Sequence, residues 1–456
     1  MLLTISIGLT GIVLLALVMS PAAGVLLLFV AKPVIDATFD SPVLGGFTLL
    51  PLIGGLVPVI VAGHLLLRSR GEQEPPLSLP TIWVLYGLNV LGFSLIIVAT
   101  EDLEAGANVF FRHINGLVGF LLLQAYFADQ RKLRSLLMAL MVAGLFPIGV
   151  GIYQMATGVV WRVEESNGVV RSIGLWHDGV NLREYVSQTM LAILLYFDLF
   201  AKGLPALRAS LLAYGGLGVV VMVRGYSKAS FLTMLAWTLC WTLLQRKTAA
   251  LVALIVPATL GALWYSPQLA GNIAKIFYKE AGALTGTVDT KLTFAGRWFG
   301  WKEMLDQWQG FPLLAKVFGS GHPALGAHND YLQMLFHGGV LGLGLYLCLL
   351  GSMGYRLAMN LRERVEPLRV GALMAYLMWM IDTIGLVPSA YSSYQWFVWG
   401  MVGLSFRLAQ ADPALEPSAA AVEAARKAGR DPAFGLLQPA SAGGRRYTLV
   451  SSPESM

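Results

Sequence analysis

Long runs of apolar residues without a charged side chain restrict the fold of this chain more than any other feature. Two of them read TIWVLYGLNVLGFSLIIVAT, at 81–100, and TAALVALIVPATLGALWY, at 248–265. A helix of about 20 such residues crosses the hydrocarbon core of a bilayer. Composition agrees, because 56% of the 456 residues are hydrophobic and only 13% are charged, against about 25% charged in soluble domains. The chain is therefore predicted to be all-α, a polytopic transmembrane helical bundle.

The sequence offers thirteen apolar segments as candidate spans, and about twelve spans are expected. The first two are short and are separated only by Ser20-Pro21, so they could form one broken helix. The segments lie at 3–19, 22–38, 45–67, 81–100, 107–127, 135–157, 186–202, 209–225, 229–246, 248–265, 331–354, 367–387 and 391–407.

The distribution of Lys and Arg predicts the orientation of the bundle. These residues gather in alternate links, and the side that carries them should face the cytoplasm. The formal charge of +6 is explained in this way and does not indicate a nucleic-acid partner. Two large loops, 158–185 and 266–330, then face the periplasm, and short helices are expected in the longer one. Residues 1–407 form the transmembrane domain, and 408–456, rich in Ala, Pro, Gly and Ser, a disordered cytoplasmic tail.

The stretch GRWFGWKEMLDQW in the longer loop predicts a short helix. It places Trp298, Trp301, Leu305 and Trp308 on one face, as in a helix that lies in the membrane interface, where membrane lipids contact its tryptophans. Arg297 stands at the start of this helix. Its guanidinium could extend to lipid phosphates, or it could hold the phosphate of a bound substrate.

The stretch GAHNDYLQMLFHGGVLG, at 326–342, joins a polar cluster to an apolar helix. Asn329 or Asp330 can cap the first turn of that helix. His328 then lies just before a helix N-terminus, where the dipole disfavours a charged imidazole. A neutral imidazole is a competent general base. The alternative is a surface histidine without a role.

Two other polar stretches lie on the predicted outer side. The turn VRGYSKASF carries Arg224 and Lys228, two cations on the side that is otherwise poor in them, which suggests a ligand. The stretch RSIGLWHDGVN carries Arg171, His177 and Asp178. A metal would need a third ligand at a recognisable spacing, so neither a metal nor a cofactor is predicted.

At these residues the chain resembles the O-antigen ligase and O-antigen polymerase family of bacterial inner-membrane glycosyltransferases. The family's ligases carry His, then Asn, Ser or Gln, then nine residues and Gly-x-x-Gly; here these are His328, Asn329, Gly339 and Gly342. The stretches RWFGWKEMLDQW and RSIGLWHDGVN are similar to two arginine elements of the family. The resemblance covers roughly residues 140–355. Where the family has Ser-Arg in a central turn, this chain has Ser227-Lys228, so either Arg224 substitutes or phosphate is held more weakly.

The resemblance implies transfer of a glycan from an undecaprenyl-pyrophosphate-linked donor to an acceptor hydroxyl, at the periplasmic face of the inner membrane. His328 would accept the hydroxyl proton. Arg297, with Arg224 or Lys228, would neutralise the leaving pyrophosphate, and Arg171 and Asn329 would contribute to substrate binding. The anomeric centre would be inverted, and no metal would be required.

Three activities remain open at this stage. A ligase joins the glycan to lipid A-core, whereas a polymerase joins lipid-linked repeat units to one another. The ligase-type histidine motif favours the first. A transporter or flippase would show charges at mid-bilayer and inverted repeats, and neither is visible in the sequence.

Overall fold

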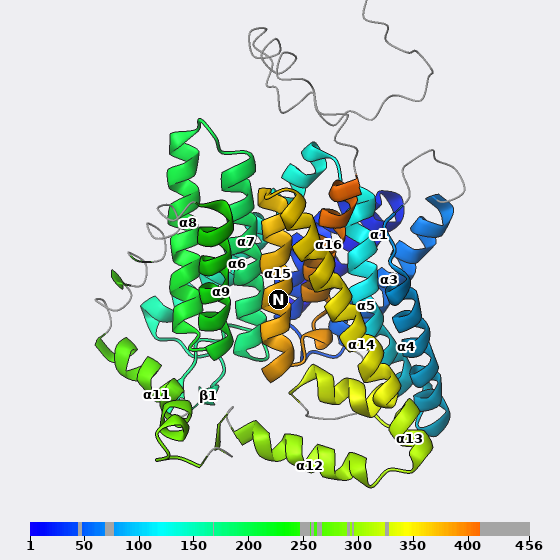
Figure 1. The fold of residues 1–456 in the computed structure, drawn as a ribbon. Helices are drawn as coiled ribbons and strands as arrows, with labels where there is room; N and C mark the ends of the chain where they lie inside the picture. Colours follow the sequence, from blue (N-terminus) through cyan, green and yellow to red (C-terminus); the bar gives the residue numbers. More distant parts are fainter. Residues whose placement is uncertain are drawn as a thin grey trace, which may run out of the picture.

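The computed structural model describes residues 1–43, 48–68, 77–166, 168–246, 256, 260–261, 267–289, 292–293, 296–323 and 328–410. In this part of the chain the structure is helical apart from one short hairpin of strands β1 and β2 (Figure 1). The elements are α1 (Leu2–Met19), α2 (Pro21–Asp36), α3 (Leu49–Arg68), α4 (Thr81–Thr100), α5 (Leu103–Phe127), α6 (Gln130–Thr157), β1 (Glu165–Ser166), β2 (Val169–Val170), α7 (Gly179–Leu199), α8 (Pro205–Arg224), α9 (Lys228–Gln245), α11 (Pro267–Leu284), α12 (Arg297–Gln309), α13 (Leu313–Phe318), α14 (Asp330–Glu363), α15 (Pro367–Gly385), η3 (Pro388–Ala390) and α16 (Ser392–Gln410).

Eight helices in the described part of the chain are long and apolar enough to cross a membrane, which confirms an all-α membrane protein. They are α1, α3, α4, α5, α6, α8, α14 and α15. The predicted number of about twelve spans stays a prediction. Of the predicted segments, 248–265 falls almost wholly outside the described residues.

Helices α7 and α16 are not among these eight, and both lie inside the bundle. α7 packs on α6, α8 and α15, and nearly all of its residues from Asn181 to Asp198 are buried. α16 packs on α5 and α15, and its Trp396 donates a hydrogen bond to Asn115 Oδ1 at 2.7 Å. A helix surrounded by protein can bury polar side chains in pairs, whereas a helix that faces lipid cannot.

The N-terminal segment forms two helices and not one broken helix. Ser20 is extended (φ −150°, ψ 92°), and α1 and α2 pack against each other on either side of it. Pro21 begins the second helix, in the position where proline fits a first helical turn.

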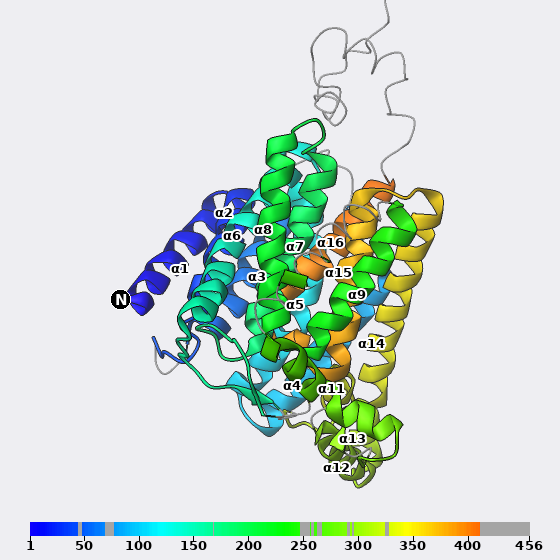
Figure 2. The same cartoon turned by 90° about the vertical axis from the view of Figure 1, so that its left-hand side faces the viewer.

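The predicted loops gather at one end of the bundle in both ribbon views (Figures 1 and 2). Loop 266–330 contains α11, α12 and α13, so the predicted short helices are present. Loop 158–185 holds the β1–β2 hairpin, but α7 begins at Gly179, inside the predicted loop. α16 ends at Gln410, and residues 411–456, which make up nearly all of the predicted tail, lie outside the described residues.

Helix α14 is interrupted at Gly339, where φ is +64°. A Cβ built on Gly339 would stand 2.3 Å from the carbonyl carbon of Val317, the penultimate residue of α13. The Ser320 amide donates to the Phe336 carbonyl at 2.8 Å beside this interruption. The glycine of the histidine motif is therefore required by the close approach of α13 to α14.

Candidate functional site

His328 occupies an unusual backbone position immediately before α14. Its φ is +44°, in the left-handed region that side chains other than glycine rarely adopt. The next residue, Asn329, caps the helix by accepting a hydrogen bond from the Leu332 amide at 3.0 Å, which confirms one of the two predicted caps. The exposed imidazole is thus held where α14 begins, and such backbone strain is found preferentially at functional sites.

The start of α14 is fastened to a second segment, residues 383–391, which runs from the end of α15 through η3 to the start of α16. The cap of α14 and the first two residues of the helix make these contacts. The bonds are Asn329 Nδ2 to the Ile384 carbonyl (3.0 Å), Ser389 Oγ to Asp330 Oδ1 (2.7 Å) and the hydroxyl pair Tyr331–Thr383 (3.0 Å).

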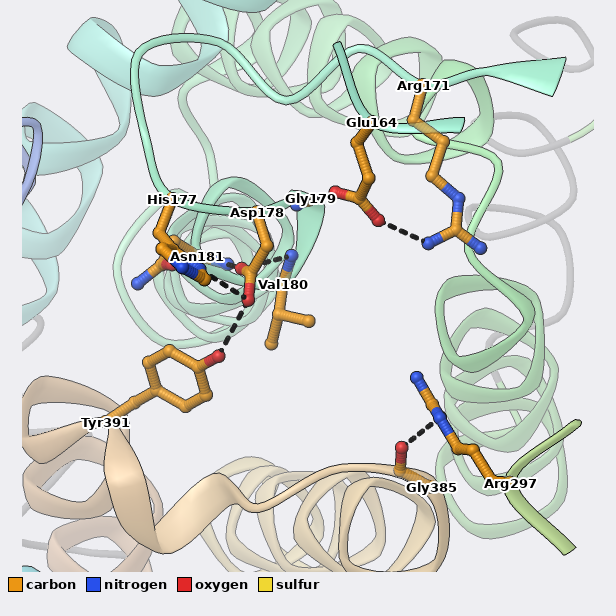
Figure 3. Close-up of polar contacts among 10 residues, drawn as sticks. All are labelled: Glu164, Arg171, His177, Asp178, Gly179, Val180, Asn181, Arg297, Gly385 and Tyr391. Atoms are coloured by element: carbon orange, nitrogen blue, oxygen red, sulfur yellow. Dashed lines mark hydrogen bonds and ion pairs between the residues drawn. The ribbon is translucent and has the colours of Figure 1, made fainter. Parts of the chain in front are cut away.

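Arg297 is fastened to the same segment. It is the first residue of α12, as predicted, and its Nη1 donates to the Gly385 carbonyl (Figure 3). This carbonyl is neutral, so the bond does not compensate the positive charge. Burial, and then the neighbouring guanidinium of Arg171, lower the pKa of Arg297. The adjacent carbonyls of Ile384 and Gly385 therefore bind the two parts of the site, Asn329 beside His328 and Arg297 on α12.

Arg171 follows strand β2 and is oriented by Glu164, which precedes β1. The Arg171 Nη1 to Glu164 Oε1 distance is 2.6 Å, and the Arg171 amide donates to the Glu164 carbonyl at 2.8 Å. The other carboxylate oxygen of Glu164 accepts from the Gly179 amide at 2.8 Å, at the start of α7. Figure 3 shows Arg171 and Arg297 directed toward one space from opposite sides.

Asp178 closes this space as the N-cap of α7. Its carboxylate accepts from the Val180 and Asn181 amides at 3.0 and 3.1 Å and from the Tyr391 hydroxyl at 3.0 Å (Figure 3). Burial opposes ionisation, but the hydrogen bonds from His177, Asn181 and Tyr391 outweigh it and lower the pKa of Asp178. Asp178 is thus a fixed negative charge at the start of α7.

The electrostatics of the site favour a neutral imidazole. Burial lowers the pKa of His328, the positive charge of Arg297 lowers it further, and the negative charge of Asp178 acts in the opposite direction. Since the ordinary value is about 6.5, a lowered pKa keeps His328 unprotonated at neutral pH. The side chain is therefore ready to accept a proton, and both charges that act on it belong to the same site.

The turn before α9 contacts α11. Lys228 forms an ion pair with Glu280 of α11, and Arg224 donates to the Tyr226 hydroxyl at 3.2 Å. Asn272 of α11 donates to the same hydroxyl at 3.2 Å. Because α11 also contacts β2, the turn is connected to the Arg171 hairpin through α11.

No three His, Cys, Asp or Glu side chains among the described residues are grouped as metal ligands are. A small cavity with room for about one water molecule lies inside the bundle. Asp330, Ser389, Tyr346 and His113 are among its lining residues. His337 of α14 packs against α5, since its Nδ1 lies 3.1 Å from His113 Nε2.

The site includes groups that the sequence did not indicate. Glu164 and Tyr391 are polar residues in loops without a motif, and the carbonyls of Ile384 and Gly385 have no residue signature at all. The sequence does offer one sign that the 383–391 segment is polar and buried, which is Asp382, an acidic residue near the end of an apolar segment. Comparison with models of protein families and with curated proteins gave no match.

Proposed function

We propose that this protein is a membrane glycosyltransferase of the O-antigen ligase type, which transfers a glycan from undecaprenyl pyrophosphate to an acceptor hydroxyl. One observation carries the proposal. His328 stands at a strained backbone position immediately before α14, within electrostatic reach of the cation Arg297 and the fixed anion Asp178, at one end of a bundle of helices long and apolar enough to cross a membrane.

Each charge suits one step of an inverting displacement. His328 takes the proton of the acceptor hydroxyl as the oxygen attacks the anomeric carbon. The negative charge of Asp178 stabilises the imidazolium that forms. The bond from the anomeric carbon to the pyrophosphate oxygen breaks, and Arg297 and Arg171 stabilise the charge that develops on the leaving group. Two guanidinium groups supply positive charge that a metal ion supplies in other enzymes, so the proposed reaction is metal-independent.

The setting of the site suits a lipid-linked donor. The donor's isoprenoid chain remains in the bilayer, and its pyrophosphate reaches the surface, where α11, α12 and α13 gather (Figure 2). Exposed Trp298 and Phe299 on α12 are suited to the same interface. This end of the bundle is proposed to face the periplasm, with the protein in the bacterial inner membrane. Lipid A-core is the proposed acceptor.

The assignment of the phosphate ligands favours Arg171 over the 224–228 turn. Arg171 and Arg297 act on each other electrostatically, whereas Lys228 is paired with Glu280. Arg171 is itself ion-paired with Glu164, so it is the position of Arg171 opposite Arg297 that favours it (Figure 3). Arg224 and Lys228 therefore remain candidates for a more distant part of the donor.

The decisive experiment is transfer by the purified protein in liposomes that contain lipid-linked glycan and core lipid. His328→Ala should reduce transfer by about 100-fold or more, since general-base catalysis contributes about 10²–10⁴-fold. His322→Ala is the matched control, because His322 is an exposed histidine of the same surface that contacts Glu101 instead. Unchanged transfer in His328→Ala would refute the assignment.

The same assay separates the alternatives. Elongation of the donor glycan without core lipid would identify a polymerase. Movement of intact donor across the bilayer without bond cleavage would identify a flippase. Strong inhibition by a chelator would contradict the metal-independent reaction.

A further inference from the structure

A buried ion pair lies beneath the site. Arg183, in the second turn of α7, approaches Asp382 of α15 with 2.6 Å between Nη1 and Oδ1, and the two side chains are 4% and 1% exposed. The Tyr394 hydroxyl of α16 donates to the other carboxylate oxygen at 2.6 Å. Asp382 thus joins three helices, α7, α15 and α16, inside the bundle.

Stability alone does not explain this pair. The Nε and Nη2 atoms of Arg183 are buried without a hydrogen-bond partner among the described residues, and so is Oε1 of the adjacent Glu184. Removing charges from water is costly, and a buried pair with incomplete hydrogen bonding is often no more stabilising than apolar side chains of the same volume. Such pairs are retained in some proteins because they select one conformation.

The conformation that this pair selects is that of the 383–391 segment. Asp382 immediately precedes Thr383, Ile384 and Gly385, which accept or exchange the hydrogen bonds of Tyr331, Asn329 and Arg297. At the other end of the segment, Tyr391 binds Asp178. Asp178 begins the helix that carries Arg183. The pair therefore closes a ring of contacts that includes Asp178 and binds Arg297 and the cap of α14.

We propose that Arg183, through Asp382, is a positioning residue that sets the separation of His328 and Arg297. The end of α15 is the common support of both, so a shift of this end changes the distance between imidazole and guanidinium. The Tyr394 hydrogen bond restrains the same carboxylate from α16. Neither Arg183 nor Tyr394 needs to touch substrate for this role.

The proposal rests on the proposed function for its effect on transfer. A displacement of about 1 Å between reacting groups can reduce a rate by about 100-fold. Arg183→Lys keeps the charge but loses the planar fork. It should lower kcat substantially and leave the KM for the lipid-linked donor nearly unchanged, because the groups that contact the donor are still present.

A second readout does not depend on activity. The rate at which diethylpyrocarbonate modifies His328, followed by mass spectrometry over a pH range in the full-length protein in nanodiscs, reports the titration of this imidazole. Arg297 and Asp178 are the charged groups that act on it. If the end of α15 loosens, Arg297 retreats and the titration midpoint of His328 moves to higher pH. Arg183→Lys and Tyr394→Phe should both show this shift.

Arg369→Gln is the matched control, since Arg369 is a buried arginine at the opposite end of α15, where it donates to the Asn360 carbonyl. Its His328 titration should equal that of the wild type. An unchanged midpoint in Tyr394→Phe and in folded Arg183→Lys would overturn the proposal, as would an equal shift in the control. Should Arg183→Lys fail to fold, Tyr394→Phe decides alone. Wild-type protein that transfers no glycan would overturn the proposed function only, because the titration still decides the positioning.

Discussion

At the scale of single residues, the site consists of one imidazole between two opposite charges. Burial lowers the pKa of His328, Arg297 lowers it further, and Asp178 opposes both effects. The two charges lie on different elements, so each can be removed separately. The site therefore allows a test in which two substitutions act on one group in opposite directions.

The pH dependence of transfer should follow the ionisation of His328. Protonation removes the base, so the rate falls as the pH falls through the lowered pKa of His328. Arg297→Gln should move this acid limb to higher pH, and Asp178→Asn should move it to lower pH. Arg297→Gln should also reduce the maximal rate by about 100-fold, the effect of removing one donor to a developing anion. Rate profiles of the three proteins check both effects.

If the acid limbs of Arg297→Gln and Asp178→Asn moved in the same direction relative to the wild type, the assignment of His328 as the base would be contradicted. Asn is a suitable replacement for Asp178, because Asn is as good an N-cap as Asp. The amide can still accept from the Val180 and Asn181 amides, so α7 should keep its start.

Sequence reasoning identified the groups with strong side-chain chemistry and missed their supports. Asn329 or Asp330 was predicted as a helix cap, and Arg297 as the start of a helix, because capping and helical periodicity are local. The acceptor of Arg297 is a main-chain carbonyl 88 residues away. A carbonyl is common to every residue, so no sequence pattern distinguishes it. Arg183 and Asp382 are 199 residues apart, and their pairing depends on how three helices pack.

At the scale of elements, the interruption of α14 holds the loop helices against the bundle. Gly339 has a positive φ, and the end of α13 approaches its backbone too closely for a side chain. Gly319, just after α13, has φ +111°, and a Cβ there would stand 1.9 Å from the His337 carbonyl oxygen. Two glycines therefore make one contact between α13 and α14.

Gly339→Ala should destabilise the protein. Gly339 has φ +64° and ψ −161°, a backbone conformation essentially restricted to glycine that costs other residues about 1–3 kcal/mol, and the contact with Val317 adds to this cost. The thermal unfolding midpoint in detergent should fall, and transfer should fall with it as α13 and the α14 start separate.

Gly344→Ala is the control on the same helix, because a Cβ there meets nothing within 4 Å. It should be neutral or slightly stabilising, since alanine favours helix by about 1 kcal/mol over glycine. Equal destabilisation by the two substitutions would show that the interruption at Gly339 is not the cause.

The apolar runs predicted nearly all long helices, since helix formation in a bilayer follows from local hydrophobicity. They did not predict which helices are surrounded by protein. α7 begins seven residues before the predicted segment at 186–202 because its first turns, with Arg183 and Glu184, are buried among other helices. From the sequence alone, charged residues at these positions are typical of a loop and not of a buried helix.

At the scale of the whole molecule, distant parts of the chain converge at one end of the bundle. The hairpin and α7 contribute Arg171 and Asp178, α12 contributes Arg297, and the start of α14 contributes His328. The 383–391 segment joins these parts through hydrogen bonds. A site assembled in this way functions only if its end of the bundle faces the compartment that contains the acceptor.

The proposed orientation can be tested by the accessibility of single cysteines in intact cells. Cys240 and Cys348 are first replaced, since both are free thiols. Asp306→Cys lies on α12, at the end that carries the site, and Lys202→Cys lies in the link after α7; both positions are exposed. A membrane-impermeant maleimide that enters the periplasm should label Asp306→Cys fully and leave Lys202→Cys unlabelled until the inner membrane is opened, because Lys and Arg gather in cytoplasmic links. Labelling with the opposite preference would place His328 in the cytoplasm and contradict a periplasmic transfer.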